Sequence, residues 1–430
     1  MPVMQRLPME LLAEIFLNID HWEDDGELVP WDSDARYQAH TIAVTIACVC
    51  KTWRAVARAT GQLWSLIVIS HDTRHWETYV DTCIALSGNH DLTIQCDLLF
   101  TMPDVLRMLL PHAARWSAFE LKSDFDDIRE LSRSGRSFPS LRVVSFAGGP
   151  LRSDVPELFD FLSESSQLKA LSLKIEFCHR DYVFSLPPLS NITSFRVNIR
   201  GNHLHSPAAL IHALEPSQST LQSFSASFQM ARVLPEVTNQ PPVLLPALRK
   251  LSLDRSAHIC MKSITAPNLE QLCLYPLGTR RFPSEDHLFD SLLAFLSRSP
   301  SPHAIRELRL TIRDWELDEN SMDMLFSCLR RLDSLQVLHI LHIPRSSDIL
   351  PISSELILAL TVRGDGLPLL PNLLSMEFRP GSYFYSEGDR EALRALLRTM
   401  ARSRATPRVV CGREVAALER YEVDITHDIL

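Results

Sequence analysis

A short phrase of apolar and polar positions recurs along the chain. It has an apolar residue, two variable residues, a second apolar residue, one variable residue and a third apolar residue. It begins at nine positions, 21 to 38 residues apart: Leu141, Leu168, Ile192, Leu221, Leu248, Leu269, Ile305, Leu335 and Leu373.

The second and third apolar residues of each phrase are separated by one variable residue. Alternation at period two is typical of a strand that buries one face and leaves the other open. The mean spacing of about 29 residues suits one strand and one connecting element per copy. We therefore predict nine short strands that stack in parallel.

Amphipathic stretches lie between several of these phrases. The residues after Val155, from Asp286 and from Ser321 place apolar side chains at helical spacing, so we predict crossover helices there. Proline ends a helix and favours an extended entry into the next strand. Prolines stand just before five phrases, at Pro139, Pro188, Pro246, Pro267 and Pro371.

The array extends beyond the nine phrases. Trp116 to Leu121, Leu92 to Ile94 and the LWSLIVI segment that ends at Ile69 are weaker strand candidates. At the other end, the stretch from Asp389 to Arg402 has one apolar face and one arginine-bearing face. We expect this stretch to be a terminal capping helix.

The first sixty residues show helical periodicity instead. The segment from Leu7 to Phe16 starts with Leu-Pro, and its apolar stripe consists of Leu11, Leu12, Ile15, Phe16 and Ile19. A second helix is predicted over Ile42 to Ala57, with Val49, Trp53 and Val56 on one face. So few residues cannot pack two such faces internally, and a partner with a helix-binding groove is expected. The alternative is that these helices only cap the end of the strand array.

The ordered elements LP, ELL, IF, VC, W and LW resemble an F-box. Together with the repeats, the chain is similar to F-box-like proteins with degenerate C-terminal leucine-rich repeats, which are substrate receptors of SCF-type ubiquitin ligases. The resemblance implies docking on a Skp-family adaptor, and through it on a cullin. The implied adaptor-binding residues are Leu7, Pro8, Leu11, Leu12, Ile15, Phe16, Val49, Cys50 and Trp53, and Arg54 also matches the motif.

The expected fold class is an α+β or α/β solenoid in three parts. Residues 1–70 are the F-box-like helical domain, residues 71–388 a degenerate leucine-rich-repeat horseshoe, and residues 389–430 a capping segment. The resemblance implies parallel strands on the concave face and helices on the convex face. An acidic insertion at about 20–41 is longer than the usual connection, and we expect a solvated loop or a further contact with the adaptor.

The variable position between the last two apolar residues of each phrase points to the open face, where a target would bind. This row consists of Ser145, Ser172, Arg196, Ser225, Ser252, Cys273, Arg309, His339 and Glu377. The candidate target-binding residues are Arg196, Arg309, His339 and Glu377, since arginine can pair with carboxylate or phosphate. Simple solvent exposure of these side chains is the alternative. His339 and His342 are three residues apart on a strand and face opposite sides, so a metal pair is not expected.

Composition narrows the functional classes. The net charge of −9 argues against nucleic acid as the main ligand, and no apolar run reaches the roughly 18 residues of a membrane span. Glu10 and Glu14 interrupt the early apolar stretch, so we expect no signal peptide and a cytoplasmic or nuclear protein. Nine cysteines without a CxxC pair predict neither disulfides nor a zinc site, and no cofactor is expected.

Catalytic motifs are absent, including GxSxG, GxxxxGK, HExxH and GxGxxG. We therefore expect a non-catalytic receptor subunit whose target protein is unknown. A leucine-rich-repeat scaffold with no role in ubiquitination is the alternative. A receptor for a small molecule is a third reading, but it needs an aromatic-lined pocket that the sequence does not indicate.

Overall fold

The computed structural model describes residues 7–18, 42–71, 73–97, 102–123, 125–151, 159–177, 186–204, 207–233, 241–275, 288–299, 304–313, 319–343, 351–363, 367–380 and 387–423. The chain divides into two compact units, Met1–Val197 and Asn198–Leu430. The boundary falls inside strand β6 (Ser194–Leu204). By this division, the N-terminal helices and the first strands belong to one unit.

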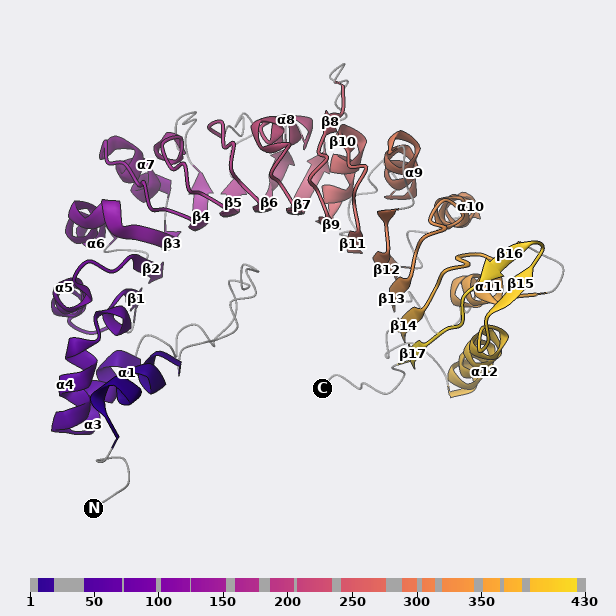
Figure 1. Ribbon diagram of the computed structural model, residues 1–430. Helices are drawn as coiled ribbons and strands as arrows, with labels where there is room; N and C mark the ends of the chain where they lie inside the picture. Colours follow the sequence, from indigo (N-terminus) through magenta and orange to yellow (C-terminus); the bar gives the residue numbers. More distant parts are fainter. Residues whose placement is uncertain are drawn as a thin grey trace. The chain divides into compact units, whose positions relative to one another are not determined.

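The fold is α/β, with a large parallel sheet of thirteen strands among the described residues. In the first unit the hydrogen-bonded order is β1-β2-β3-β4-β5, and in the second it is β7-β9-β11-β12-β13-β14-β17 (Figure 1). The first five strands are β1 (Leu66–Ser70), β2 (Leu92–Asp97), β3 (Trp116–Ser123), β4 (Val143–Leu151) and β5 (Ala170–Phe177). The strands of the second unit are β7 (Ser223–Val233), β9 (Lys250–Arg255), β11 (Gln271–Tyr275), β12 (Glu307–Arg313), β13 (Val337–Ile343), β14 (Ser375–Pro380) and β17 (Arg420–Val423).

The recurring phrase accounts for nine of these strands. Each of the nine strands starts two residues after the first residue of its phrase; they are β4, β5, β6, β7, β9, β11, β12, β13 and β14. In β5, for example, Leu168 precedes the strand and is buried, while Leu171 and Leu173 point into the core. Apolar burial on one face and register-matched neighbours explain why these residues form strands. The nine predicted strands are confirmed. The three weaker strand candidates are also strands, β1, β2 and β3.

Helices connect the strands, and in each unit they run along one side of them (Figure 1). The first unit has α5 (Trp76–Ser87), α6 (Met102–Leu109) and α7 (Phe125–Arg133), and the second has α8 (Pro207–His212), α9 (Leu288–Arg298), α10 (Glu319–Leu329), α11 (Pro351–Leu360) and α12 (Glu387–Ser403). The helices predicted from Asp286, Ser321 and Asp389 are confirmed as α9, α10 and α12. Of the helix predicted after Val155, residues 152–158 lie outside the described residues, and Asp160–Leu162 form a 3₁₀ turn.

Several short elements were not predicted. The strand β17 adds to the sheet beyond β14, and β15 (Arg408–Val410) and β16 (Arg413–Val415) form an antiparallel hairpin. A further pair, β8 (Val243–Leu244) and β10 (Ile264–Thr265), is parallel. The 3₁₀ connections are η2 (Gly61–Trp64), η3 (Leu110–Arg115), η5 (Glu215–Ser217) and η6 (Ser256–Ser263).

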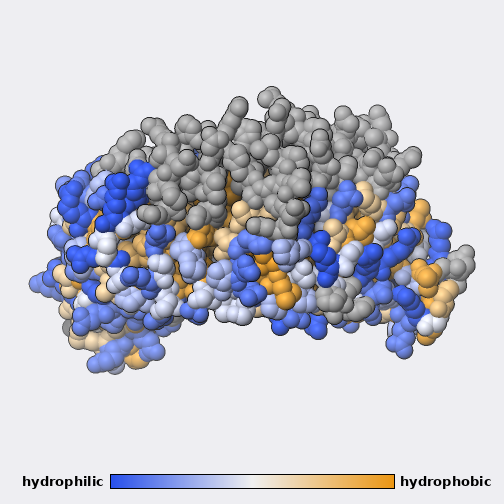
Figure 2. Space-filling model, turned by 90° about the horizontal axis from the view of Figure 1, so that it is seen from above, coloured by the Kyte–Doolittle hydropathy of each residue, from blue (hydrophilic) through white to orange (hydrophobic). Residues whose placement is uncertain are grey.

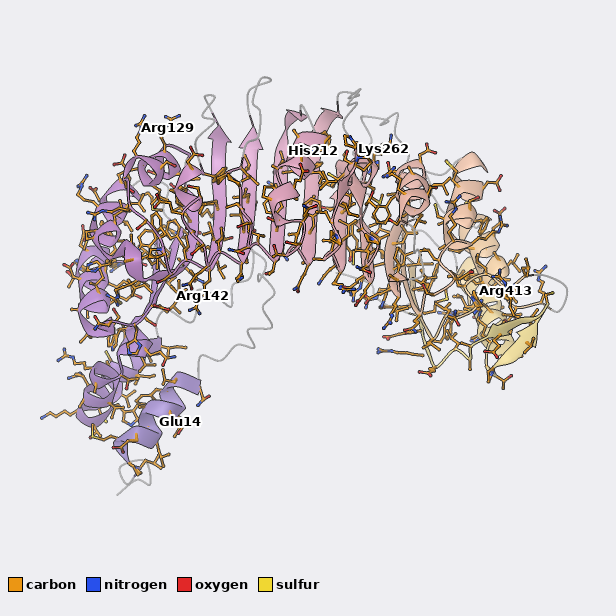
Figure 3. The ribbon with its side chains drawn as sticks, turned by 45° about the horizontal axis from the view of Figure 1, so that its top comes forward. Glu14, Arg129, Arg142, His212, Lys262 and Arg413 are labelled. Atoms are coloured by element: carbon orange, nitrogen blue, oxygen red, sulfur yellow. The ribbon has the colours of Figure 1, made fainter. Side chains whose placement is uncertain are left out.

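A buried arginine holds the region around α12 together. Arg404 is fully buried, and its Nε donates to the carbonyl of Leu360 at 2.8 Å and its Nη1 to that of Leu370 at 3.0 Å. Its Nη2 donates to the carbonyl of Leu369. Burial lowers the pKa of Arg404 to about 10, so the side chain keeps its charge at neutral pH. Arg413, which is labelled in Figure 3, has its Nη1 3.4 Å from Asp333 Oδ2.

Hydrophilic residues make up most of the described surface in view in Figure 2, with apolar residues scattered among them. Within the described ranges, no helix is both long and apolar enough to cross a bilayer. Nor does any group of three or more His, Cys, Asp or Glu side chains there suit a metal ion.

Candidate interaction surfaces

Three short helices at the N-terminus build a small core of their own. They are α1 (Met9–Asn18), α3 (Ile42–Val49) and α4 (Lys51–Ala59). Phe16 is fully buried, and its ring centroid lies 4.9 Å from that of Trp53. The buried members of this core are Leu12, Phe16, Ile46, Val56 and Ala57. The core joins the helices into one unit, since none of them is long enough to be stable alone.

The second predicted helix is two helices. Cys50 has extended backbone angles, φ −157° and ψ 173°, and separates α3 from α4. Its Sγ accepts a hydrogen bond from the Trp53 N–H at 3.4 Å, which caps the start of α4. Arg54 Nε then donates to the carbonyl of Ala47 at 2.8 Å and ties the two helices together. The expectation that Val49 and Trp53 share one helical face is therefore wrong, because the cap turns the chain between them.

Apolar side chains remain exposed on this helical group. Ten large apolar residues are exposed in the described part of the chain, and half of them lie here: Met9, Leu11, Ile15, Val44 and Val49. Their exposed fractions run from 42% for Val44 to 57% for Val49. Single exposed apolar residues are ordinary, but a concentration within two short helices marks an interaction surface.

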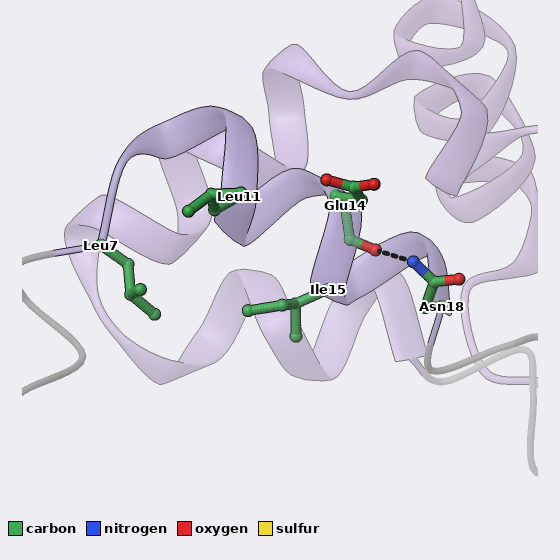
Figure 4. A pocket seen from close by; sticks show the side chains of 5 residues that line it. All are labelled: Leu7, Leu11, Glu14, Ile15 and Asn18. Atoms are coloured by element: carbon green, nitrogen blue, oxygen red, sulfur yellow. Dashed lines mark hydrogen bonds between the residues drawn. The ribbon is translucent and has the colours of Figure 1, made fainter.

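A pocket of about 410 Å³ lies along α1 (Figure 4). Leu7, Leu11 and Ile15 supply its apolar lining, and Glu14 and Asn18 its polar rim. Asn18 Nδ2 donates to the carbonyl of Glu14 at 2.8 Å, which closes the last turn of the helix. The pocket can receive an apolar side chain, with an exposed carboxylate at its edge.

The structure separates the predicted adaptor-binding residues into two groups. Leu12 and Phe16 are buried in the helical core, so they hold the helices together and have no surface to offer a partner. Trp53 is partly buried and packs against the same core. The residues open to a partner are Pro8, Leu11, Ile15, Val49 and Cys50, whereas Leu7, like Trp53, is partly buried against the core. Ile19 and the acidic insertion lie outside the described residues.

The second candidate surface is the open face of the strands in the second unit. The variable positions of the phrase stand in register across neighbouring strands, so that Arg309 pairs with His339 and His339 with Glu377. The predicted row is thus correct for these three residues. Arg196 lies on β6 in the other unit and is a separate position.

A hydrogen-bonded arrangement occurs twice on this face. Glu307 Oε1 accepts from Arg309 Nε at 2.6 Å, and its Oε2 accepts from Gln271 Nε2 at 2.6 Å. Two strands away, Glu377 Oε1 accepts from Arg379 Nε, and its Oε2 from His339 Nδ1. In both cases a glutamate binds the arginine two residues later on its own strand and a donor on the preceding strand.

These contacts set the ionisation of the two glutamates. Partial burial alone raises the pKa of each carboxyl group, but the hydrogen bonds and positive charges of the partners outweigh it. The pKa values of Glu307 and Glu377 are therefore lower than usual, and both groups are ionised at neutral pH. The hydrogen bond to Glu307 in turn raises the pKa of Arg309.

Sequence reasoning missed Glu307, Arg379 and Gln271. A signal was present, because Glu-Leu-Arg in β12 and Glu-Phe-Arg in β14 both place an acid and a base on the same strand face. The partner on the preceding strand could not be read without the register.

No family model matches this chain, and no curated protein matches its sequence.

Proposed function

We propose that this chain is the substrate-recognition subunit of an SCF-type ubiquitin ligase. The F-box-like helices dock on a Skp-family adaptor, which connects to a cullin, and a leucine-rich-repeat horseshoe binds a target protein on its concave strand face. The observation that supports the proposal best is the set of exposed apolar side chains on α1 and α3, which lie outside the buried core of the helical group.

The helical group does not need this apolar surface for its own folding. Leu12 and Phe16 supply the core side of α1, while Leu11 and Ile15 remain almost half exposed on the same helix. Burying an apolar side chain of this size releases about 1.5–3 kcal/mol. A partner that covers several of them gains binding energy of the kind seen when a helix enters a hydrophobic groove.

The mechanism is proximity. A receptor that holds the adaptor through its helices and a target through its strands brings the target close to ubiquitin carried by other subunits. The chain then needs two binding surfaces and no reacting groups of its own.

The alternative is a leucine-rich-repeat scaffold in which the helices only cap the strand array. One contact favours a capping role, since Trp64 Nε1 donates to the carbonyl of Ala57 at 2.8 Å and fixes α4 beside the start of β1. That contact involves α4 and η2, however, and leaves the apolar residues of α1 and α3 uncovered.

Copurification with a Skp-family adaptor tests the proposal. The wild-type chain is expected to bind, and the double variant Leu11→Asp, Ile15→Asp to lose binding, because two carboxylates buried in the interface cost several kcal/mol. Both residues are exposed, so the fold should survive the change. Leu367→Asp, at a residue that is 71% exposed in the other unit, is the matched control.

Absence of binding by the wild-type chain would refute the ligase role. Binding that persists in the double variant would show that the adaptor uses another surface.

A further inference from the structure

The paired glutamate and arginine residues on β12 and β14 present their charges unequally. The side chains of Glu307 and Glu377 are 22% and 18% exposed, whereas those of Arg309 and Arg379 are 47% and 59% exposed. Both carboxyl oxygens of each glutamate already accept a hydrogen bond. At each of these two pairs, a group that approaches the face therefore meets the guanidinium donors before the carboxyl group.

Each arginine is held through Nε. A bond through Nε fixes the guanidinium group, and its Nη groups face outward as donors of the kind that bind a carboxylate. Arg309 also forms a side-chain hydrogen bond with Tyr275, which further restricts its motion and uses part of its donor capacity. Groups that are fixed before a ligand arrives lose less conformational entropy on binding.

The register sets the spacing of the two arginines. Arg309 stands opposite His339, and Arg379 stands opposite Leu341, so the arginines are two strands apart and offset by two residues. Strand spacing and rise place their Cα atoms about 12 Å apart. Residues i and i+4 of an extended peptide span about 13 Å and point to the same side.

Leu341 lies on the strand between the two arginines. It is 40% exposed, although its neighbours on this face are mostly polar. The residue i+2 of an extended peptide would point to the same side as residues i and i+4 and would meet this part of β13.

We propose that the open face of β12, β13 and β14 binds an extended acidic segment of the form acid, any residue, apolar residue, any residue, acid. The two acidic side chains pair with Arg309 and Arg379, and the apolar side chain packs on Leu341. That the segment belongs to a ubiquitination target rests on the proposed function, but the binding itself does not.

Fluorescence anisotropy of a labelled peptide, Ser-Glu-Ser-Leu-Ser-Glu-Ser, tests the site on the full chain. We expect saturable binding that weakens as ionic strength rises. The peptide with both Glu residues replaced by Gln should bind at least about tenfold more weakly, because it loses charge-assisted hydrogen bonds. These comparisons use only the wild-type protein, so misfolding of a variant cannot affect them.

Protein variants locate the site. Arg309→Gln and Arg379→Gln should each weaken binding about tenfold. Arg249→Gln is the matched control, since Arg249 is also half exposed and paired with a glutamate, Glu270, but lies just before β9. The affinity of this variant for the Glu peptide should stay within about twofold of the wild-type value.

Equal binding of the Glu and Gln peptides, or full binding by both arginine variants, would overturn the proposal. Binding of a phosphoserine peptide without binding of the Glu peptide would overturn the assignment to carboxylates. Adaptor copurification of the wild-type chain separates the two proposals: if it fails while the peptide still binds, the ligase role alone is refuted.

Discussion

The N-terminal helices and the open strand face of β12–β14 expose opposite kinds of chemistry. The helices leave methionine, leucine, isoleucine and valine side chains exposed. The strand face buries its apolar residues and leaves a network of paired charges. Apolar area supplies binding energy without much directional demand, whereas fixed charges select for a partner with matching groups.

The two surfaces therefore make different demands on a ligand. On the helices, buried and exposed apolar residues alternate along α1, so the same helix builds the core and presents an exposed apolar side. On the strands, each glutamate is used to orient an arginine. Changes that separate these roles should therefore have effects of very different size.

The largest effect is expected inside the helical group. Phe16→Ala should destabilise it by about 3–5 kcal/mol, because a fully buried aromatic side chain is removed and a cavity remains. Leu11→Ala, on the exposed side of the same helix, should change stability by less than about 0.5 kcal/mol. Hydrogen exchange of the amides in α1 and α4 measures both. Similar losses in the two variants would contradict the division of α1 into a core side and a partner side.

A smaller effect is expected on the strand face. Because the pKa values of Glu307 and Glu377 are lowered in the folded state, their contribution to stability is present above the usual glutamate value of about 4.3 and is lost as the pH falls through and below it. The double variant Glu307→Gln, Glu377→Gln should therefore lose less stability than the wild type on acidification. Each pair should contribute less than about 1 kcal/mol, since its arginine is half exposed.

Urea unfolding near neutral pH and in acid measures this difference. Identical acid sensitivity of variant and wild type would mean that the network does not stabilise the fold.

The smallest effect concerns the cap between α3 and α4. Serine is a better N-cap residue than cysteine, so Cys50→Ser should stabilise α4 by a few tenths of a kcal/mol, while Cys50→Ala should cost about 0.5 kcal/mol or more. The Trp53 N–H donates to Cys50 Sγ, so hydrogen exchange of this amide reports on both changes. We expect the stability of α4 to rise in Cys50→Ser and to fall in Cys50→Ala. A change in the same direction in both variants would rule out a capping role.

Much of the sheet could be predicted because the spacing of apolar residues in the phrase determines which face of each strand is buried. An apolar residue ahead of each strand and two more within it leave only one face for the core, as Leu168, Leu171 and Leu173 show for β5. The short strand β17 follows the same spacing from Leu418, but tyrosine stands at the second apolar position and two of its four residues are charged, so it was missed. Its place beside β14 is set by tertiary pairing.

The helical surface could be predicted only in part. Helical spacing puts Leu11, Leu12, Ile15 and Phe16 on a broad apolar stripe, but spacing alone does not say which edge of a stripe meets the core. The break at Cys50 was also hidden, since cysteine has no strong preference for a cap and the flanking residues favour a helix. On the strand face, the register was needed before Glu307 could be placed beside Gln271.

The three carbonyl groups that Arg404 binds lie 34 to 44 residues earlier in the chain. During synthesis they therefore leave the ribosome before the arginine does. At about 5–20 residues per second, several seconds pass in which Leu360, Leu369 and Leu370 have emerged but lack this donor. The end of the sheet is therefore completed only when Arg404 has emerged. A ribosome that stalls in this interval would present an unfinished sheet edge to chaperones.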